Sequence, residues 1–253
     1  MHVLSIKDEH KPMSMPTEVL VKLAKSVQPL VFETGITDMP YSVSGTTFLV
    51  GYEGNPYVIT TRHGLNPEHL GPICIFPSDT SHQFLPLKDV FFVPRDNFSE
   101  DFVELALIAV DTARIAHIDV AQATLIDLSL ACGNWEGQES DFVILGFPEE
   151  GAFFDFDDQT LHANRVAFHA RYVGRSCIPY HHEIEVNEPH TLTSFSGFSG
   201  SPVFTWSKSL NSAPTAVLCG MVIRGSSSSG KMHFLDSSIL LDALKVKRTL
   251  EAK

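Results

Sequence analysis

Short apolar stretches separated by turn residues fill most of the chain. Residues 45–52 and 57–61 flank a turn that contains Gly54 and Pro56, a pattern typical of a β-hairpin. Further strands are expected at 73–76, 90–93, 102–110, 142–145, 165–172, 183–186, 202–204 and 216–223. Many short strands, with 16 glycines and 15 prolines, predict an all-β barrel or sandwich.

Helical spacing occurs only near the two ends. Residues 1–13 are polar and are expected to be irregular. Pro16 suits the first position of a helix, so a short helix is predicted over 16–26. Capping side chains at 236–238 precede leucines at helical spacing, which predicts a C-terminal helix over 238–252.

The apolar pattern is weakest near residues 113–119, which suggests a division into two β units. We therefore expect an N-terminal extension over 1–28, a first β unit over 29–115 and a second over 116–253.

Composition narrows the class of function. The net charge of −12 argues against a nucleic-acid partner. No apolar stretch has the length of a membrane span, and the N-terminus does not resemble a secretory signal, so no membrane partner and a cytoplasmic location are expected. The four cysteines lie far apart without a CxxC pair, which predicts free thiols and neither a zinc cage nor a redox pair.

Three segments carry candidate chemistry. His63 follows the apolar strand 57–61 and precedes a glycine. Glu104 lies at the head of an apolar strand, with Asp101 three residues earlier. Ser199 lies between glycines in a tight turn that leads into a strand. Each signal alone is commonly structural, but the chain order histidine, acid, serine is one of the known triad orders.

These segments resemble the trypsin-like (chymotrypsin-fold) serine proteases, with the closest likeness to bacterial V8-like or HtrA-like forms. The His63 segment is similar to the family's V-I-T-A-A-H motif, and Glu104 to Ile108 to D-I-A-L-L. Residues 197–203 resemble G-N-S-G-S-P-V, and residues 220–225 resemble G-I-V-S-W-G. The resemblance implies two six-stranded antiparallel β-barrels with a short N-terminal helix and a C-terminal helix.

The resemblance also implies roles for individual residues. Ser199 is the expected nucleophile, His63 its general base and Glu104 the acid that orients the histidine. The backbone N–H groups of Gly197 and Ser199 are expected to form the oxyanion hole. Residues 223–225 (Ile223, Arg224 and Gly225) are expected to pair with the substrate main chain, and Thr193 and Ser194 to set the base of the specificity pocket.

The sequence departs from the family at two of these positions. Glutamate stands where the family has aspartate, and Asp101 is the competing acid, although 101 and 104 would face opposite sides of one strand. Phe198 replaces an acid that pairs with a freshly cut N-terminus in zymogen-activated relatives. We therefore expect no such switch, and either a preformed oxyanion loop or an inactive one.

Together these observations predict a serine endopeptidase that acts on a peptide or protein substrate through an acyl-enzyme, without a metal or another cofactor. No acid lies at the base of the pocket, so a preference for lysine or arginine is not expected. The alternative is a catalytically inactive trypsin-like fold that acts as a protein-binding module. The substrate and the oligomeric state are left open by the sequence.

Overall fold

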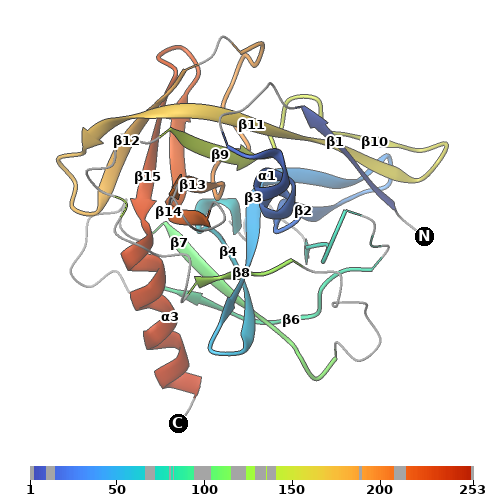
Figure 1. Cartoon of the computed structure of the whole chain (residues 1–253). Helices are drawn as coiled ribbons and strands as arrows, with labels where there is room; N and C mark the ends of the chain where they lie inside the picture. The colour runs from blue at the N-terminus through green and yellow to red at the C-terminus, as the bar shows by residue number, and fades with distance from the viewer. Residues whose placement is uncertain are drawn as a thin grey trace.

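The structure is a computed structural model that describes most of the chain. The described residues are 3–9, 15–65, 72–79, 81, 83–93, 104–114, 124–128, 135, 141–187, 190–207 and 215–251. They form two β-sheets, a short helix near the N-terminus and a longer helix at the C-terminus (Figure 1). The expected all-β architecture with terminal helices is confirmed.

The first sheet is built from the N-terminal half of the chain. Its strands follow the order β5-β2-β3-β4-β7-β6, and a short strand, β8, pairs with β3. Their bounds are β2 Val27–Ile36, β3 Met39–Tyr52, β4 Asn55–Thr61, β5 Ile73–Cys74, β6 Leu87–Phe92, β7 Leu105–Val110 and β8 Ile126–Asp127. The predicted hairpin at 45–61 is therefore the β3–β4 pair.

The second sheet closes into a ring. Its path runs β11-β12-β15-β14-β13-β9, and β9 also pairs with β11, so six strands form a closed barrel. Their bounds are β9 Phe142–Gly146, β11 Thr160–Arg175, β12 His181–Val186, β13 Pro202–Ser207, β14 Thr215–Ser226 and β15 Lys231–Asp236. A closed ring leaves few unpaired strand edges.

Five strands lie outside the sequence-based expectation: β1 Val3–Glu9, β2, β8, β10 Phe153–Asp155 and β15. The prediction of an irregular N-terminus is wrong for β1, which pairs in parallel with β11, while β10 pairs with β11 on the other side. β8 falls after residue 115, yet it pairs in parallel with β3 of the first sheet. Both pairings join segments far apart in the chain, and local sequence patterns do not encode such partners.

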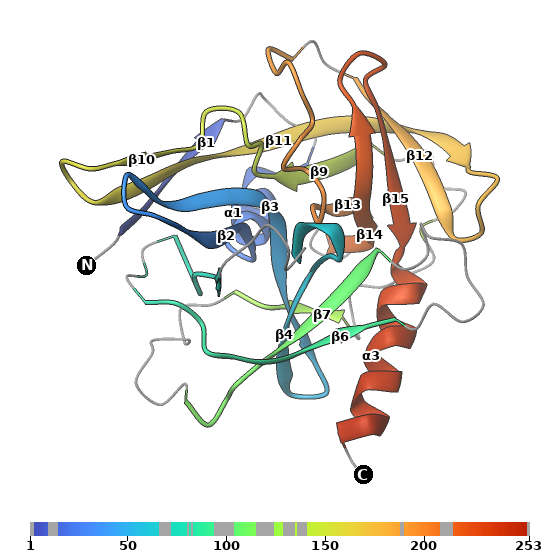
Figure 2. The same ribbon diagram turned by 180° about the vertical axis from the view of Figure 1, so that it is seen from behind.

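The two helices pack against the sheets, and the C-terminal helix contacts both of them. α1 Thr17–Ala24 follows Pro16, close to the predicted bounds, and buries Leu20 and Ala24. α3 Ser237–Glu251 continues from β15 and runs down beside β7 of the first sheet (Figures 1 and 2). Lys247 of α3 forms an ion pair with Asp89, so the C-terminal helix is anchored to the first sheet. None of the described helices is long and apolar enough to cross a membrane.

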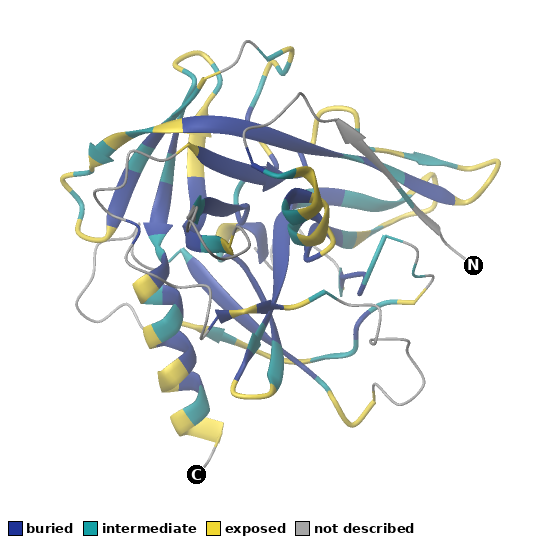
Figure 3. Cartoon of the chain, viewed as in Figure 1, coloured by how far each residue is buried: buried dark blue, intermediate teal, exposed yellow. Residues whose placement is uncertain are grey.

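The core is continuous across the interface between the sheets. β7 and β9 are buried along their whole length (Figure 3). Arg165 of β11 is 1% exposed and donates to Asp79 at 2.6 and 3.0 Å, and its guanidinium also lies over the ring of Phe147. A buried charge needs such partners, so this pair fixes how the second barrel sits against the 75–79 segment.

Candidate active site

His63 stands at the point where the first sheet gives way to a short 3-10 turn. β4 ends at Thr61, and η1 His63–Leu65 follows. The side chain of His63 is 48% exposed. The buried strand therefore fixes the backbone, while the imidazole remains open to solvent and to a substrate.

Glu104 lies directly before β7, which pairs with β4, so the two chain segments meet. The carbonyl of Glu104 accepts a hydrogen bond from Arg62 N at 2.8 Å. Its Oε2 lies 2.6 Å from His63 Nδ1 and 3.2 Å from His63 N. Glu104 is thus the acid that contacts the histidine, whereas Asp101 lies outside the described residues.

The environment of Glu104 favours its ionised form. Burial alone raises the pKa of this carboxyl, but the hydrogen bonds and charge of His63, together with the Arg62 guanidinium, outweigh burial and lower the pKa below its ordinary value. An ionised carboxylate only accepts hydrogen bonds, so Nδ1 of a neutral His63 carries the proton. Nε2 is then left with a lone pair.

Ser199 faces the same cavity as His63. A cavity of about 320 Å³ is lined by both residues and by Glu104, Ser194, Phe195, Ser196, Ile223, Arg224 and Gly225. The Ser199 hydroxyl donates to the carbonyl of Ile223 at 3.3 Å rather than to His63. The cavity therefore joins the three predicted groups, but the serine–histidine hydrogen bond is not made in this conformation.

The loop that carries Ser199 depends on two glycines. Gly197 has φ +93° and Gly200 has φ +91°, a region that other residues rarely adopt. A Cβ on Gly197 would lie 2.3 Å from the carbonyl oxygen of Phe147, and one on Gly200 would lie 2.0 Å from that of Thr46. The loop is therefore wrapped tightly against both sheets.

The peptide between Ser196 and Gly197 is held in one orientation. The Ser196 carbonyl accepts a hydrogen bond from Glu149 N at 3.0 Å. Because the peptide is trans, the Gly197 N–H points the opposite way. Within the described residues, neither this N–H nor that of Ser199 has a hydrogen-bond partner. Two unpaired donors two residues apart are what an oxyanion hole requires.

Phe198 anchors the loop by burial of its side chain. Its side chain is 1% exposed and stacks on Phe168, with ring centroids 5.2 Å apart and planes inclined by 22°. Phe195 lies edge-on to it at 5.9 Å. Burial in this aromatic cluster holds the loop, so its geometry does not depend on a charged N-terminus.

Thr46 is an anchor of the loop that sequence reasoning missed. This residue of β3 is fully buried. Its Oγ1 donates to the Gly197 carbonyl at 2.7 Å and accepts from Phe147 N at 2.9 Å, while Thr46 N donates to the Ser199 carbonyl at 2.9 Å. Its only signal in the sequence was its place in the apolar stretch 45–52, which was predicted as a strand.

The predicted substrate-binding residues divide into two groups. Ser194, Ile223, Arg224 and Gly225 line the cavity. Thr193 is absent from the lining, because Glu150 accepts hydrogen bonds from its N and Oγ1 at 2.8 and 2.9 Å. These bonds lower the pKa of Glu150. Phe195 and Ser196 line the cavity but were not predicted.

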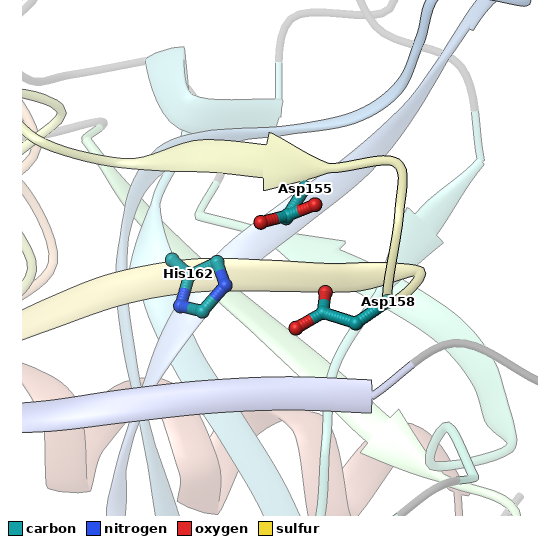
Figure 4. Close-up of side chains that lie close together, drawn as sticks. All are labelled: Asp155, Asp158 and His162. Atoms are coloured by element: carbon teal, nitrogen blue, oxygen red, sulfur yellow. The ribbon is translucent and has the colours of Figure 1, made fainter.

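The described residues also contain a candidate cation site away from this cavity. Asp155, Asp158 and His162 lie on the β10–β11 hairpin, with one potential ligand atom from each within 4.8 Å of the others (Figure 4). Two carboxylates and one imidazole suit a divalent transition metal. None of the three residues lines the cavity at Ser199.

A larger hollow of about 730 Å³ lies near the start of α3. Its lining includes Trp135, His182 and Asp236. His182 Nε2 lies 3.3 Å from Asp236, and His182 Nδ1 lies 2.9 Å from the Tyr172 hydroxyl. These polar groups satisfy one another, which is the usual state of a structural network.

Comparison with known proteins supports the fold. No protein-family model and no curated protein sequence matches this chain. The structure is similar to the inactive form of a serine-to-alanine mutant of Rv3671c from M. tuberculosis H37Rv, with a TM-score of 0.51 and 15% identity over 93% of this chain and 92% of that chain. A second structure, from work on the coupled folding and binding of the intrinsically disordered Sesbania mosaic virus VPg protein, has a TM-score of 0.47 and 12% identity, over 85% and 89% of the two chains. The first likeness, together with the two sheets and the terminal helices, gives this chain a chymotrypsin-like fold.

Proposed function

We propose that this protein is a serine-type endopeptidase with His63, Glu104 and Ser199 as its catalytic triad. The single observation that carries the proposal is the convergence of groups at one cavity. A carboxylate-bound histidine and a serine line it, and the serine lies on a loop with two N–H donors that have no partner in the described part of the chain. Random placement of the three residue types would not produce this convergence.

The first step is acylation. The Ser199 hydroxyl turns from the Ile223 carbonyl toward His63 and attacks the substrate carbonyl, so that an O–C bond forms while the proton passes to Nε2. The negative oxygen of the tetrahedral intermediate is stabilised by the N–H groups of Gly197 and Ser199. Glu104 stays ionised and stabilises the imidazolium.

The second half returns the enzyme to its starting state. The proton on His63 Nε2 moves to the leaving amine as the C–N bond breaks, which leaves an acyl-Ser199 ester. Water then attacks this ester and gives its proton to His63. The acid product leaves when the C–Oγ bond breaks and the proton returns to Ser199.

The edge of β14 supports binding of an extended peptide. Pairing between β13 and β14 ends at Pro202 and Met221, and Val222 then exchanges backbone hydrogen bonds of 2.8 Å with Gly200 and Ser201 of the serine loop. The stretch of β14 that follows, 223–225, lines the cavity at Ser199. Ile223 also lies at an irregularity in the β14–β15 pairing, between Val222 and Arg224. A substrate strand added here places its scissile carbonyl beside Ser199.

Labelling with a fluorophosphonate probe tests the proposed nucleophile. The probe forms an O–P bond with an activated serine and releases fluoride. We expect one adduct, mapped to Ser199, that is absent from Ser199→Ala and slowed in His63→Ala. As a matched control, Ser201→Ala removes a second buried hydroxyl of the same loop without removing the nucleophile.

Absence of an adduct, under conditions that label a known serine protease, would contradict the proposal. The protein-binding module would then be the better account, because the Ser199 hydroxyl already has a carbonyl partner in Ile223. The V8-like or HtrA-like type, the peptide or protein substrate and the cytoplasmic location are predictions from the sequence.

A further inference from the structure

The ring of Phe195 closes one side of the cavity at Ser199, and this ring is the floor of the cavity. Phe195 lines the cavity, yet its side chain is only 5% exposed. A Cβ added to Gly225 would lie 3.1 Å from Phe195 Cδ2 and 3.0 Å from Met232 Cγ. Two side chains therefore already fill the space against Gly225, and no substrate side chain can enter between the ring and this backbone.

The position of this ring matters because of where the substrate lies. In the proposed function, a peptide paired with residues 223–225 of β14 places its scissile carbonyl at the N–H groups of Gly197 and Ser199. The side chain of the residue that carries this carbonyl, the P1 residue, then points between segments 194–196 and 223–225, which line the cavity. The ring of Phe195 extends from the first of these segments toward Gly225 of the second and so lies between them.

The ring of Phe195 is fixed from behind. His190 packs against it with ring centroids 4.8 Å apart, Phe168 lies at 5.8 Å and Phe198 at 5.9 Å. The turn that carries it is also bound, since Ser196 N donates to Ser194 Oγ at 3.0 Å. A ring packed on several sides forms a floor rather than a gate, because moving it would open a void in the core.

The polar groups next to the floor are neutral hydroxyls, and the charged Arg224 of the opposite wall is exposed to solvent. The hydroxyls of Ser194 and Ser196 lie at the rim and bond to each other at 3.0 Å. The charged groups of the lining, Glu104 and Arg224, lie beside His63 and on β14, not on the loop that carries the floor.

We propose that Phe195 closes the specificity pocket and restricts the P1 residue of the substrate to small, uncharged side chains such as glycine, alanine and serine. This inference rests on the proposed function, since it assigns the substrate class of the same site. Phe195 is a specificity-determining residue in this account and takes no part in bond making.

The test compares diphenyl phosphonate peptides that differ only at P1, with alanine, phenylalanine or glutamate, and a fluorophosphonate without a P1 side chain. Each diphenyl phosphonate loses one phenolate as Ser199 Oγ bonds to phosphorus and the serine proton passes to His63. The rate constants of labelling are measured on the wild type, Phe195→Ala and Phe195→Leu. The leucine variant retains a readout if the alanine variant does not fold.

Phe142→Leu is the matched control. Phe142 is 1% exposed in the same barrel and packs on Trp135 and Tyr172, and its ring contacts within the described residues do not include Phe195. Circular dichroism checks that each variant is folded. The control removes a phenylalanine ring from the core of the same barrel but leaves the ring of Phe195 in place.

For the wild type we expect labelling about 100-fold faster with P1 alanine than with P1 phenylalanine, since pocket contacts discriminate by roughly 10–200-fold. Phe195→Ala or Phe195→Leu should reduce this ratio at least about tenfold, while Phe142→Leu leaves it unchanged. The inference is overturned if the phenylalanine or glutamate probe labels the wild type faster than the alanine probe does. The proposed function still stands in that case, provided that the fluorophosphonate reacts. Failure of every probe to react overturns both.

Discussion

Replacing Thr46 with valine removes one hydroxyl and keeps the outline of the side chain. The hydroxyl is fully buried and makes two hydrogen bonds, to the Gly197 carbonyl at 2.7 Å and from Phe147 N at 2.9 Å. Valine leaves both backbone groups without a partner. Each orphaned buried group costs about 1–3 kcal/mol, so we expect Thr46→Val to lower the free energy of unfolding by roughly 3 kcal/mol.

The same substitution should slow the chemistry at Ser199. The Gly197 carbonyl is one of two points at which Thr46 of β3 holds the loop that carries the oxyanion donors; the other, the bond from Thr46 N to the Ser199 carbonyl, is kept in the valine variant. Without the bond to the Gly197 carbonyl the loop samples other orientations, and loss of one oxyanion donor costs about 10²–10³ in rate. Because Thr46 holds the donors rather than supplying one, we expect a smaller decrease of at least about tenfold in fluorophosphonate labelling.

Two variants separate positioning from general destabilisation. Thr46→Ser keeps the hydroxyl and should recover most of the labelling rate. Thr47→Val removes the neighbouring buried hydroxyl, which bonds to the Gln28 carbonyl at 3.2 Å, and should lower stability without slowing labelling. The reasoning is refuted if Thr46→Val, measured where it is folded, labels as fast as the wild type.

Further predictions concern the acid, the loop anchor and the C-terminal helix. Glu104→Gln should lower the rate of peptide cleavage by about 10³–10⁴-fold in a folded protein, because an amide no longer favours the Nδ1–H tautomer of His63; turnover with circular dichroism checks this. The folded pKa of Glu104 is lowered, so its stabilisation is complete above its unfolded pKa of about 4.5 and is lost as the pH falls through the folded value; the difference in unfolding free energy between wild type and Glu104→Gln should shrink as the pH falls from 6 to 3. Phe198→Asp should destabilise the protein by about 4 kcal/mol or more in urea unfolding, since it replaces a packed ring with a buried charge. Tyr57→Phe removes the 3.1 Å hydrogen bond to Glu251 and should cost about 1 kcal/mol on unfolding without changing fluorophosphonate labelling.

Strands and terminal helices were predictable where the signal is local. Short apolar runs on either side of the turn at Gly54 indicated the β3–β4 hairpin, and capping residues before a leucine stripe indicated α3 within one residue at each end. β1 gave no such signal, because it is stabilised by pairing with β11, more than 150 positions later. A partner at this distance leaves no local signal in the polar segment 3–9, although part of β11 was predicted at 165–172.

The residues of the candidate site were also predictable only where the signal is local. His63, Glu104 and Ser199 were identifiable because each lies next to a strand with a characteristic short motif. The partners that fix the loop were not, since Thr46 and Glu149 act through contacts with backbone atoms of a distant segment. Phe195 follows the predicted Ser194, but its role depends on its distance from Gly225, which only the fold determines.

Cleavage of unlabelled peptides is the most direct test of the central claim. A library of short peptides is incubated with the wild type, Ser199→Ala and Ser201→Ala, and the products are sequenced by mass spectrometry. The account predicts new termini at internal peptide bonds with the wild type and Ser201→Ala, and none with Ser199→Ala. Cleavage that persists in Ser199→Ala, or a wild type that reacts with fluorophosphonate but cuts no peptide bond, would contradict the assignment of this protein as a serine endopeptidase.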